Sequence, residues 1–202
     1  MRKLLVAAAL LLAPGVALAQ APVVLDFELC LNSSCTVGTA YSAQGVTFNP
    51  STQSIVTGPE SWGIVGTNGP QFLAFNGLNP GYGMTMTLAT PQASISMDVS
   101  RSAGSSAGDT FTATIYDGAV AVGTTTITLA NINTWTTVTL TAPRFDSIVW
   151  SGSGVGFHPY GVDNIHLSAA VVAPVPALSV GGVAVLAALL ATLGLFALRR
   201  GL

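Results

Sequence analysis

The clearest strand pattern in the chain is Thr110-Phe111-Thr112-Ala113-Thr114-Ile115, in which polar and apolar residues alternate. Successive side chains of a β-strand point to opposite faces of a sheet, so the alternation produces one apolar and one polar face. Threonine is β-branched and favours strands, and in this stretch it leaves the polar face uncharged. The stretch therefore predicts a half-buried β-strand.

The same two-residue period recurs through most of residues 22–168, and no amphipathic helix pattern interrupts it. The apolar members of these runs include Val46, Phe48, Met84, Met86, Leu88, Ala93, Ile95, Met97, Val99, Ile127, Leu129, Val138 and Leu140. Turn sequences separate the runs, among them Asn68-Gly69-Pro70, Asn76-Gly77 and Asp117-Gly118. We predict an all-β domain made of two packed antiparallel sheets, a β-sandwich of jelly-roll or Greek-key type.

The N-terminal end has the pattern of a secretion signal. Arg2 and Lys3 precede an apolar run, and a small-x-small sequence ends at Ala19. This order is typical of a signal peptide, which is removed from the mature protein. We predict a signal peptide over residues 1–19, with cleavage between Ala19 and Gln20.

The C-terminal end is long enough to cross a membrane. Residues 177–198 contain no charge, and 22 residues in a helix span the ~30 Å hydrocarbon layer. Arg199 and Arg200 follow at once, and basic residues that flank a span stay on the cytoplasmic side. We predict a transmembrane helix over 177–198, preceded by a domain of residues 20–168 outside the cytoplasm and a linker of residues 169–174.

The tail also resembles a known sorting signal. It reads Val175-Pro176-Ala177-Leu178-Ser179-Val180-Gly181-Gly182, followed by the apolar helix and Arg199-Arg200. This order is similar to the IPTL-CTERM class, a relative of PEP-CTERM, which occurs in Gram-negative bacteria that make exopolysaccharide. The resemblance implies that residues 175–202 are a transient membrane anchor, cleaved near Pro176 by an exosortase-like protease. A plain single-span anchor is the alternative.

Charge limits the possible partners. The chain between the two ends has two basic residues, Arg101 and Arg144, and a net charge of −6. Its acidic residues are Asp26, Glu28, Glu60, Asp98, Asp109, Asp117, Asp146 and Asp163. Nucleic acid is excluded as a partner because phosphate binding needs a basic patch, whereas a cation such as calcium is favoured.

Cys30 and Cys35 are the two cysteines of the chain, and no Cys/His cluster suggests zinc. In an exported protein we expect them to form a disulfide that shapes the short segment between them. Two free thiols are the alternative.

A second resemblance concerns the domain itself. The segments Val24-Leu25-Asp26-Phe27-Glu28, Gln44-Gly45-Val46-Thr47-Phe48 and Gly161-Val162-Asp163-Asn164-Ile165-His166-Leu167 look like the start, the second strand and the end of domains that accompany such tails. Those domains are similar to carbohydrate-binding-module-like jelly rolls. Lectin-like jelly rolls often hold a structural calcium between the first and last strands, which implies a site formed by Asp26, Glu28, Asp163 and Asn164, whose oxygens suit calcium.

Asp163 is the acid that most needs an explanation. In a regular strand it shares a face with Ile165 and Leu167, so we expect it to point into the core. A buried carboxylate needs a partner, which backbone amides of the preceding glycine-rich loop, Arg144 or a cation could supply. The alternative to a calcium site is a hydrogen-bonded aspartate at a strand end, with Asp26 and Glu28 solvated.

Sugar binding in such modules uses aromatic rings that stack on pyranose rings. Trp62, Tyr82 and Tyr160 lie beside Gly or Pro, where exposure is expected, and packing beneath a loop is the alternative for each. Trp135 and Trp150 fall within strand patterns and are expected in the core.

No Ser/His/Asp constellation, metalloprotease helix or phosphate-binding loop occurs in the sequence, so we predict no catalytic residues. The sequence favours a noncatalytic protein of the cell surface or the extracellular matrix, associated with exopolysaccharide or biofilm. A lectin-like module with a defined glycan ligand is the first alternative, and a polysaccharide hydrolase is the second.

Overall fold

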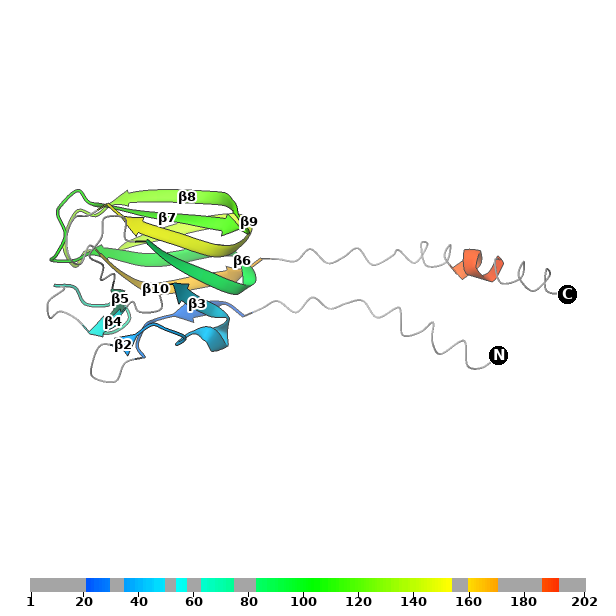
Figure 1. The fold of residues 1–202 in the computed structure, drawn as a ribbon, viewed down its shortest axis with the longest axis horizontal. Helices are drawn as coiled ribbons and strands as arrows, with labels where there is room; N and C mark the ends of the chain where they lie inside the picture. The colour runs from blue at the N-terminus through cyan, green and yellow to red at the C-terminus, as the bar shows by residue number, and fades with distance from the viewer. Residues whose placement is uncertain are drawn as a thin grey trace. The chain divides into compact units, whose positions relative to one another are not determined.

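The computed structural model describes residues 21–29, 35–49, 54–57, 63–74, 83–153, 160–170 and 187–192. Contacts between residues divide the chain into two units, of which the first comprises residues 19–171. The first unit contains the described strands (Figure 1).

These strands are β1 (Val23–Leu25), β2 (Cys35–Thr36), β3 (Val46–Asn49), β4 (Ser54–Thr57), β5 (Gln71–Ala74), β6 (Gly83–Arg101), β7 (Thr110–Asp117), β8 (Val120–Thr128), β9 (Thr136–Gly152) and β10 (Tyr160–Ala169). A 3-10 turn, η2, covers Ser42–Gln44. Every pairing between the strands is antiparallel. The prediction of an all-β antiparallel domain is confirmed.

The alternation in the sequence directs side chains as expected. In β7, Phe111, Ala113 and Ile115 are fully buried, while the threonines between them lie at the opposite face. Two pairs of these outer threonines are joined to threonines of β8 by hydroxyl–hydroxyl hydrogen bonds of 2.9 and 3.1 Å. The polar face is thus a layer of hydroxyl groups without charge.

The strand order across the sheet is β2-β4-β5-β10-β6-β9-β7-β8, with β1 also beside β10 and β3 beside β6. Figure 1 shows β7 and β8 at one side of the domain and β4 and β5 at the other. The two sheets that the sequence predicts are joined into one hydrogen-bonded sheet of ten strands. The reason is that β6 and β9, which have 19 and 17 residues, run through both parts.

The register of β6 breaks between Thr87 and Gln92. Before the break, β6 lies between β3 and the second half of β9, and after it β6 lies between β10 and the first half of β9. Pro91 falls inside this break, where the missing proline N–H costs no ladder hydrogen bond. Gln92 is buried there, and its amide donates to the carbonyl oxygen of Thr90 at 2.9 Å.

One large core cluster joins side chains from both parts of the sheet. Its aromatic centre contains Phe27, Tyr41, Phe48 and Trp150, with ring centroids 5.5 to 6.5 Å apart. The hydroxyl oxygen of Tyr41 accepts the backbone N–H of Phe27 at 2.8 Å, so this buried polar atom has a partner. Trp150 is fully buried, as the sequence predicts.

The predicted signal peptide, its cleavage site at Ala19 and Gln20, and the sorting residues from Val175 to Ser179 with Arg199 and Arg200 lie outside the described residues. Residues 187–192 are helical and lie within the predicted span of 177–198. Among the described residues, no helix has both the length and the apolar character needed to cross a bilayer.

Candidate functional site

A β-bulge in β10 decides where Asp163 points. Val162 pairs with Val99 and Asp163 pairs with Asp98, but the next pair is His166 with Ser96, so β10 has one extra residue. Asn164 has a φ of 51°, the left-handed conformation in which asparagine is tolerated. The expectation that Asp163 shares a face with Ile165 and Leu167 is therefore wrong.

Those two residues lie in the large core cluster together with Val162, and the neighbouring Asp163 faces the opposite side of the sheet. Asp163 is nevertheless fully buried, with 0% of its surface exposed. The segment before β5 covers it, because the backbone N–H and the hydroxyl of Thr67 donate to Oδ2 at 2.6 and 3.0 Å. The N–H of Asn164 donates to Oδ1 at 2.7 Å. Backbone amides are therefore the expected partners of Asp163 that the structure contains. Most of them belong to the segment before β5.

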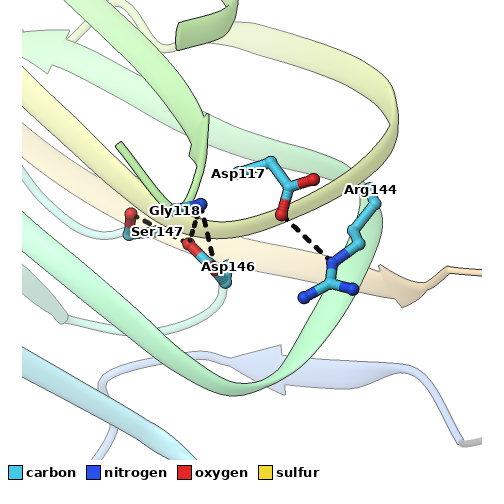
Figure 2. Close-up of polar contacts among 5 residues, drawn as sticks. All are labelled: Asp117, Gly118, Arg144, Asp146 and Ser147. Carbon is cyan, nitrogen blue, oxygen red and sulfur yellow. Dashed lines mark hydrogen bonds and ion pairs between the residues drawn. The ribbon is translucent and has the colours of Figure 1, made fainter. Parts of the chain in front are cut away.

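Arg144 is engaged elsewhere. Figure 2 shows it beside the turn between β7 and β8, where its Nε lies 3.1 Å from Oδ1 of Asp117. Both side chains are exposed, so this ion pair contributes little to stability. In the same turn, the carboxylate of Asp146 accepts the N–H of Gly118 at 3.1 and 3.2 Å.

Glu28 is the second acid that contacts the segment before β5. Its Oε1 accepts the N–H of Gln71 at 2.8 Å. Gly69 lies so close that a Cβ added there would touch the Glu28 carboxylate. Glu28 and Asp163 thus hold the segment of residues 66–71, named here the anchored loop, from the two ends of the domain sequence.

Burial and charge shape the acid–base properties of this region. Burial raises the pKa of Asp163, and the hydrogen bonds from Thr67 and Asn164 oppose that rise. Burial also raises the pKa of Tyr41, and the negative charges of Asp26, Asp163 and Glu28 add to this effect. Three carboxylates therefore surround one buried hydroxyl group.

The oxygen atoms around the anchored loop are of the types that bind calcium in proteins. A Cβ added to Gly66 would touch the carbonyl oxygen of Gln71 and would lie 2.8 Å from the carbonyl oxygen of Gly69 and 3.0 Å from Oδ2 of Asp163. Carboxylate and backbone carbonyl oxygens are the ligands that calcium prefers. Among the residues that the structure describes, no group of three or more His, Cys, Asp or Glu side chains is arranged to hold a metal. A cation here would depend on backbone carbonyls as well as on Glu28 and Asp163.

The other two predicted calcium ligands have different contacts. Asp26 is exposed, and its Oδ1 accepts the N–H of Glu28 at 3.4 Å. The bulge turns the side chain of Asn164 towards Asp98, to which its Nδ2 donates at 3.1 Å. The carbonyl oxygens of Gly69 and Gln71 were not predicted, and the turn signal Asn68-Gly69-Pro70 is the one feature of the sequence that marks this loop.

Asn164 is the centre of a row of polar side chains. Its Oδ1 accepts a hydrogen bond from Nδ2 of Asn68 at 2.6 Å and lies 2.7 Å from Nε2 of His166. Asp98 accepts the hydroxyl of Thr137 at 2.6 Å. This polar row of Asn68, Asp98, Thr137, Asn164 and His166 combines amides, a carboxylate and a hydroxyl, which are groups that can bind the hydroxyls of a sugar.

Of the three predicted sugar-binding aromatics, Tyr160 lies within the described residues. Tyr160 is fully buried and packs against Phe111 with ring centroids 5.1 Å apart, so its expected exposure is wrong. Burial raises the pKa of its hydroxyl. Trp62 and Tyr82 lie outside the described residues. Trp135 is half-buried just before β9, and its indole N–H donates to the carbonyl oxygen of Val65 at 2.8 Å.

One of the two cysteines of the predicted disulfide lies within the described residues. Cys35 begins β2, and the part of the chain that the structure describes contains no free cysteine. Cys30 lies outside the described residues, so its pairing with Cys35 stays a prediction.

Comparison with known proteins identifies the tail. Residues 173–200 match the IPTL-CTERM motif, which implies an exported, surface-associated protein. The search of curated proteins found no match to the chain.

Three domains are among the solved structures that are similar to this chain. The K2 cleaved adhesin domain of Lys-gingipain has 13% identity and a TM-score of 0.46, over 73% of this chain and 99% of that one. The xylan-binding domain from CBM 22 has 12% identity and a TM-score of 0.42, over 73% and 94%. The family 11 carbohydrate-binding module from Clostridium thermocellum has 18% identity and a TM-score of 0.40, over 74% and 96%.

Proposed function

We propose that this chain is a noncatalytic protein of the cell surface or the extracellular matrix, sorted by its C-terminal tail and associated with exopolysaccharide. The observation that carries the proposal is the IPTL-CTERM motif at residues 173–200, directly after an all-β domain that ends at Ala169. An exosortase-like protease recognises the tail while its helix lies in the membrane, and cleavage near Pro176 then frees the domain for its final location.

The proposal includes a sandwich of jelly-roll type. The register break of β6 divides the sheet into two layers, and the core lies between them. Met86 from before the break and Met97 from after it are both fully buried in the same cluster, which supports this arrangement.

The proposal also includes a structural calcium at the anchored loop. Glu28, Asp163 and the carbonyl oxygens of Gly69 and Gln71 would hold the ion, which would fasten the loop to the first and last strands of the domain. Calcium would supply charge neutralisation and no redox chemistry.

Removal of residues 175–202 should abolish membrane association of the protein in its native cells. The helix of the tail is the proposed anchor, so the truncated protein should move from the membrane and surface fractions into the periplasm or the medium. Cell fractionation and digestion of surface proteins on intact cells measure this change.

Intact-mass spectrometry of the untruncated protein separates sorting from plain anchoring. A product that ends near Pro176 supports the sorting tail, whereas a chain that still contains Arg199 and Arg200 contradicts cleavage. Export itself is contradicted if the full-length chain, with residues 1–19 retained, is recovered from the cytosol.

The polar row favours a lectin as the second candidate function. If it binds a glycan, Asp98→Ala should weaken binding by about tenfold, because a lost charge-assisted hydrogen bond costs about 1.5 kcal/mol. Asp117→Ala is the matched control, since it removes an exposed acid on the far side of β9 from β6. Glycan-array binding measures both variants, and an array without signal for the unchanged protein contradicts the lectin.

A further inference from the structure

β8 lies at one end of the strand order that the described residues form. β7 is its one neighbour among the described strands. The N–H of Leu129, next to the end of β8, donates towards β7, to the carbonyl oxygen of Asp109 at 2.7 Å. In an antiparallel pair the peptide groups of successive residues alternate in direction, so those of Thr124, Thr126 and Thr128 point away from β7. Their N–H and C=O groups form a row along the outer edge.

This edge lacks three of the features that normally prevent edge-to-edge pairing, namely short length, charged side chains and proline. The other strands with one described neighbour, β1, β2 and β3, have three, two and four residues, whereas β8 has nine. Residues 118–143 contain no charged residue, and β8 contains no proline. A fourth protective feature, a β-bulge, is confined to the start of β8, where Gly123 pairs with Ile115 and Ala121 with Tyr116, so that Val122 is the extra residue.

The side chains of β8 are uncharged, and most of them are exposed. Val120 is 64% exposed and Val122 is 37% exposed. Thr124, Thr126 and Thr128 follow them and are exposed as well. The turn before β8 is fixed by the hydrogen bonds from Gly118 to Asp146 (Figure 2), so the edge is presented in a defined position.

We propose that β8 pairs in antiparallel fashion with β8 of a second copy of this chain, which extends one sheet through a twofold dimer. An antiparallel pair of identical strands is self-complementary, as a twofold interface requires. The segment between the two ends has a net charge of −6, so two copies repel each other over most of their surfaces. At the uncharged edge two copies can approach each other without that repulsion. Because the pairing uses the same edge of both copies, the assembly stops at a dimer.

Sedimentation velocity of the full chain in a mild detergent, over a range of concentrations, tests the proposal. The unchanged chain should shift from one to two copies as concentration rises. Thr126→Lys should raise the dimer dissociation constant by about tenfold or more, because two like charges then lie close together across the paired edges.

Thr87→Lys is the matched control. Thr87 is also an exposed threonine, but it lies on β6, inside the sheet, so its variant should dimerise as the unchanged chain does. A chain that stays monomeric at every concentration overturns the proposal. If the two lysine substitutions weaken the dimer equally, the proposal is also overturned, because that result points to an effect of net charge. A dimer that neither substitution weakens overturns it as well, because that result points to association through the tail.

Discussion

Asp163→Asn should lower the free energy of unfolding of the domain by about 2–3 kcal/mol. The carboxylate is fully buried and accepts three hydrogen bonds, two at Oδ2 and one at Oδ1. Asparagine has one acceptor oxygen, so its NH2 group would face an N–H donor at the other position. Removal of the charge relieves some desolvation, but the unsatisfied donors inside the protein cost more than this relief.

The measurement is urea unfolding followed by tryptophan fluorescence, to which the buried Trp150 contributes. Amide hydrogen exchange should rise at Thr67, whose N–H loses its acceptor. Asp117→Asn is the control, because it breaks an exposed ion pair and should cost less than about 1 kcal/mol. Equal effects of the two substitutions would contradict the structural role assigned to Asp163.

The sequence predicted the strands well because their signal is local. The alternation of Phe111, Ala113 and Ile115 depends only on the two faces of a strand, and the structure buries all three. The continuity of β6 was not predictable in this way, because Pro91 interrupts the pattern between two apolar runs. Whether a proline ends a strand depends on the neighbouring strand, and here the register break removes the need for its N–H.

The candidate site was predicted only in part, for a related reason. The resemblance to lectin-like jelly rolls implied Glu28 and Asp163, but the bulge at Asn164 reverses the face on which Asp163 lies. A single extra residue has this effect because side chains alternate with a period of two. The carbonyl oxygens of Gly69 and Gln71 have no signature in the sequence, since every residue has a carbonyl group and only the path of the loop brings these two together.

Gly66→Ala should be the most damaging small change in the anchored loop. The added methyl group would meet three oxygens, the carbonyls of Gly69 and Gln71 and Oδ2 of Asp163, and backbone atoms cannot turn away as the end of a side chain can. We expect a loss of about 2–3 kcal/mol in the free energy of unfolding. The same displacement should remove the effect of calcium, which in the unchanged full chain should raise the melting temperature by about 3 °C at about tenfold excess over its dissociation constant.

Gly123→Ala is the matched control for this prediction. Its added Cβ would lie 3.1 and 3.2 Å from Cγ1 and Cδ1 of Ile115 and 3.8 Å from Cδ2 of Leu140, which are side-chain atoms and at longer distances than the backbone oxygens around Gly66. Both substitutions restrict the unfolded chain equally, so the difference between them reports on the folded state. If calcium raises the melting temperature of the Gly66→Ala variant as much as that of the Gly123→Ala variant, the ion does not bind at these oxygens. If calcium changes neither variant nor the unchanged chain, the loop is held by Glu28 and Asp163 through their hydrogen bonds to its backbone amides, without a metal.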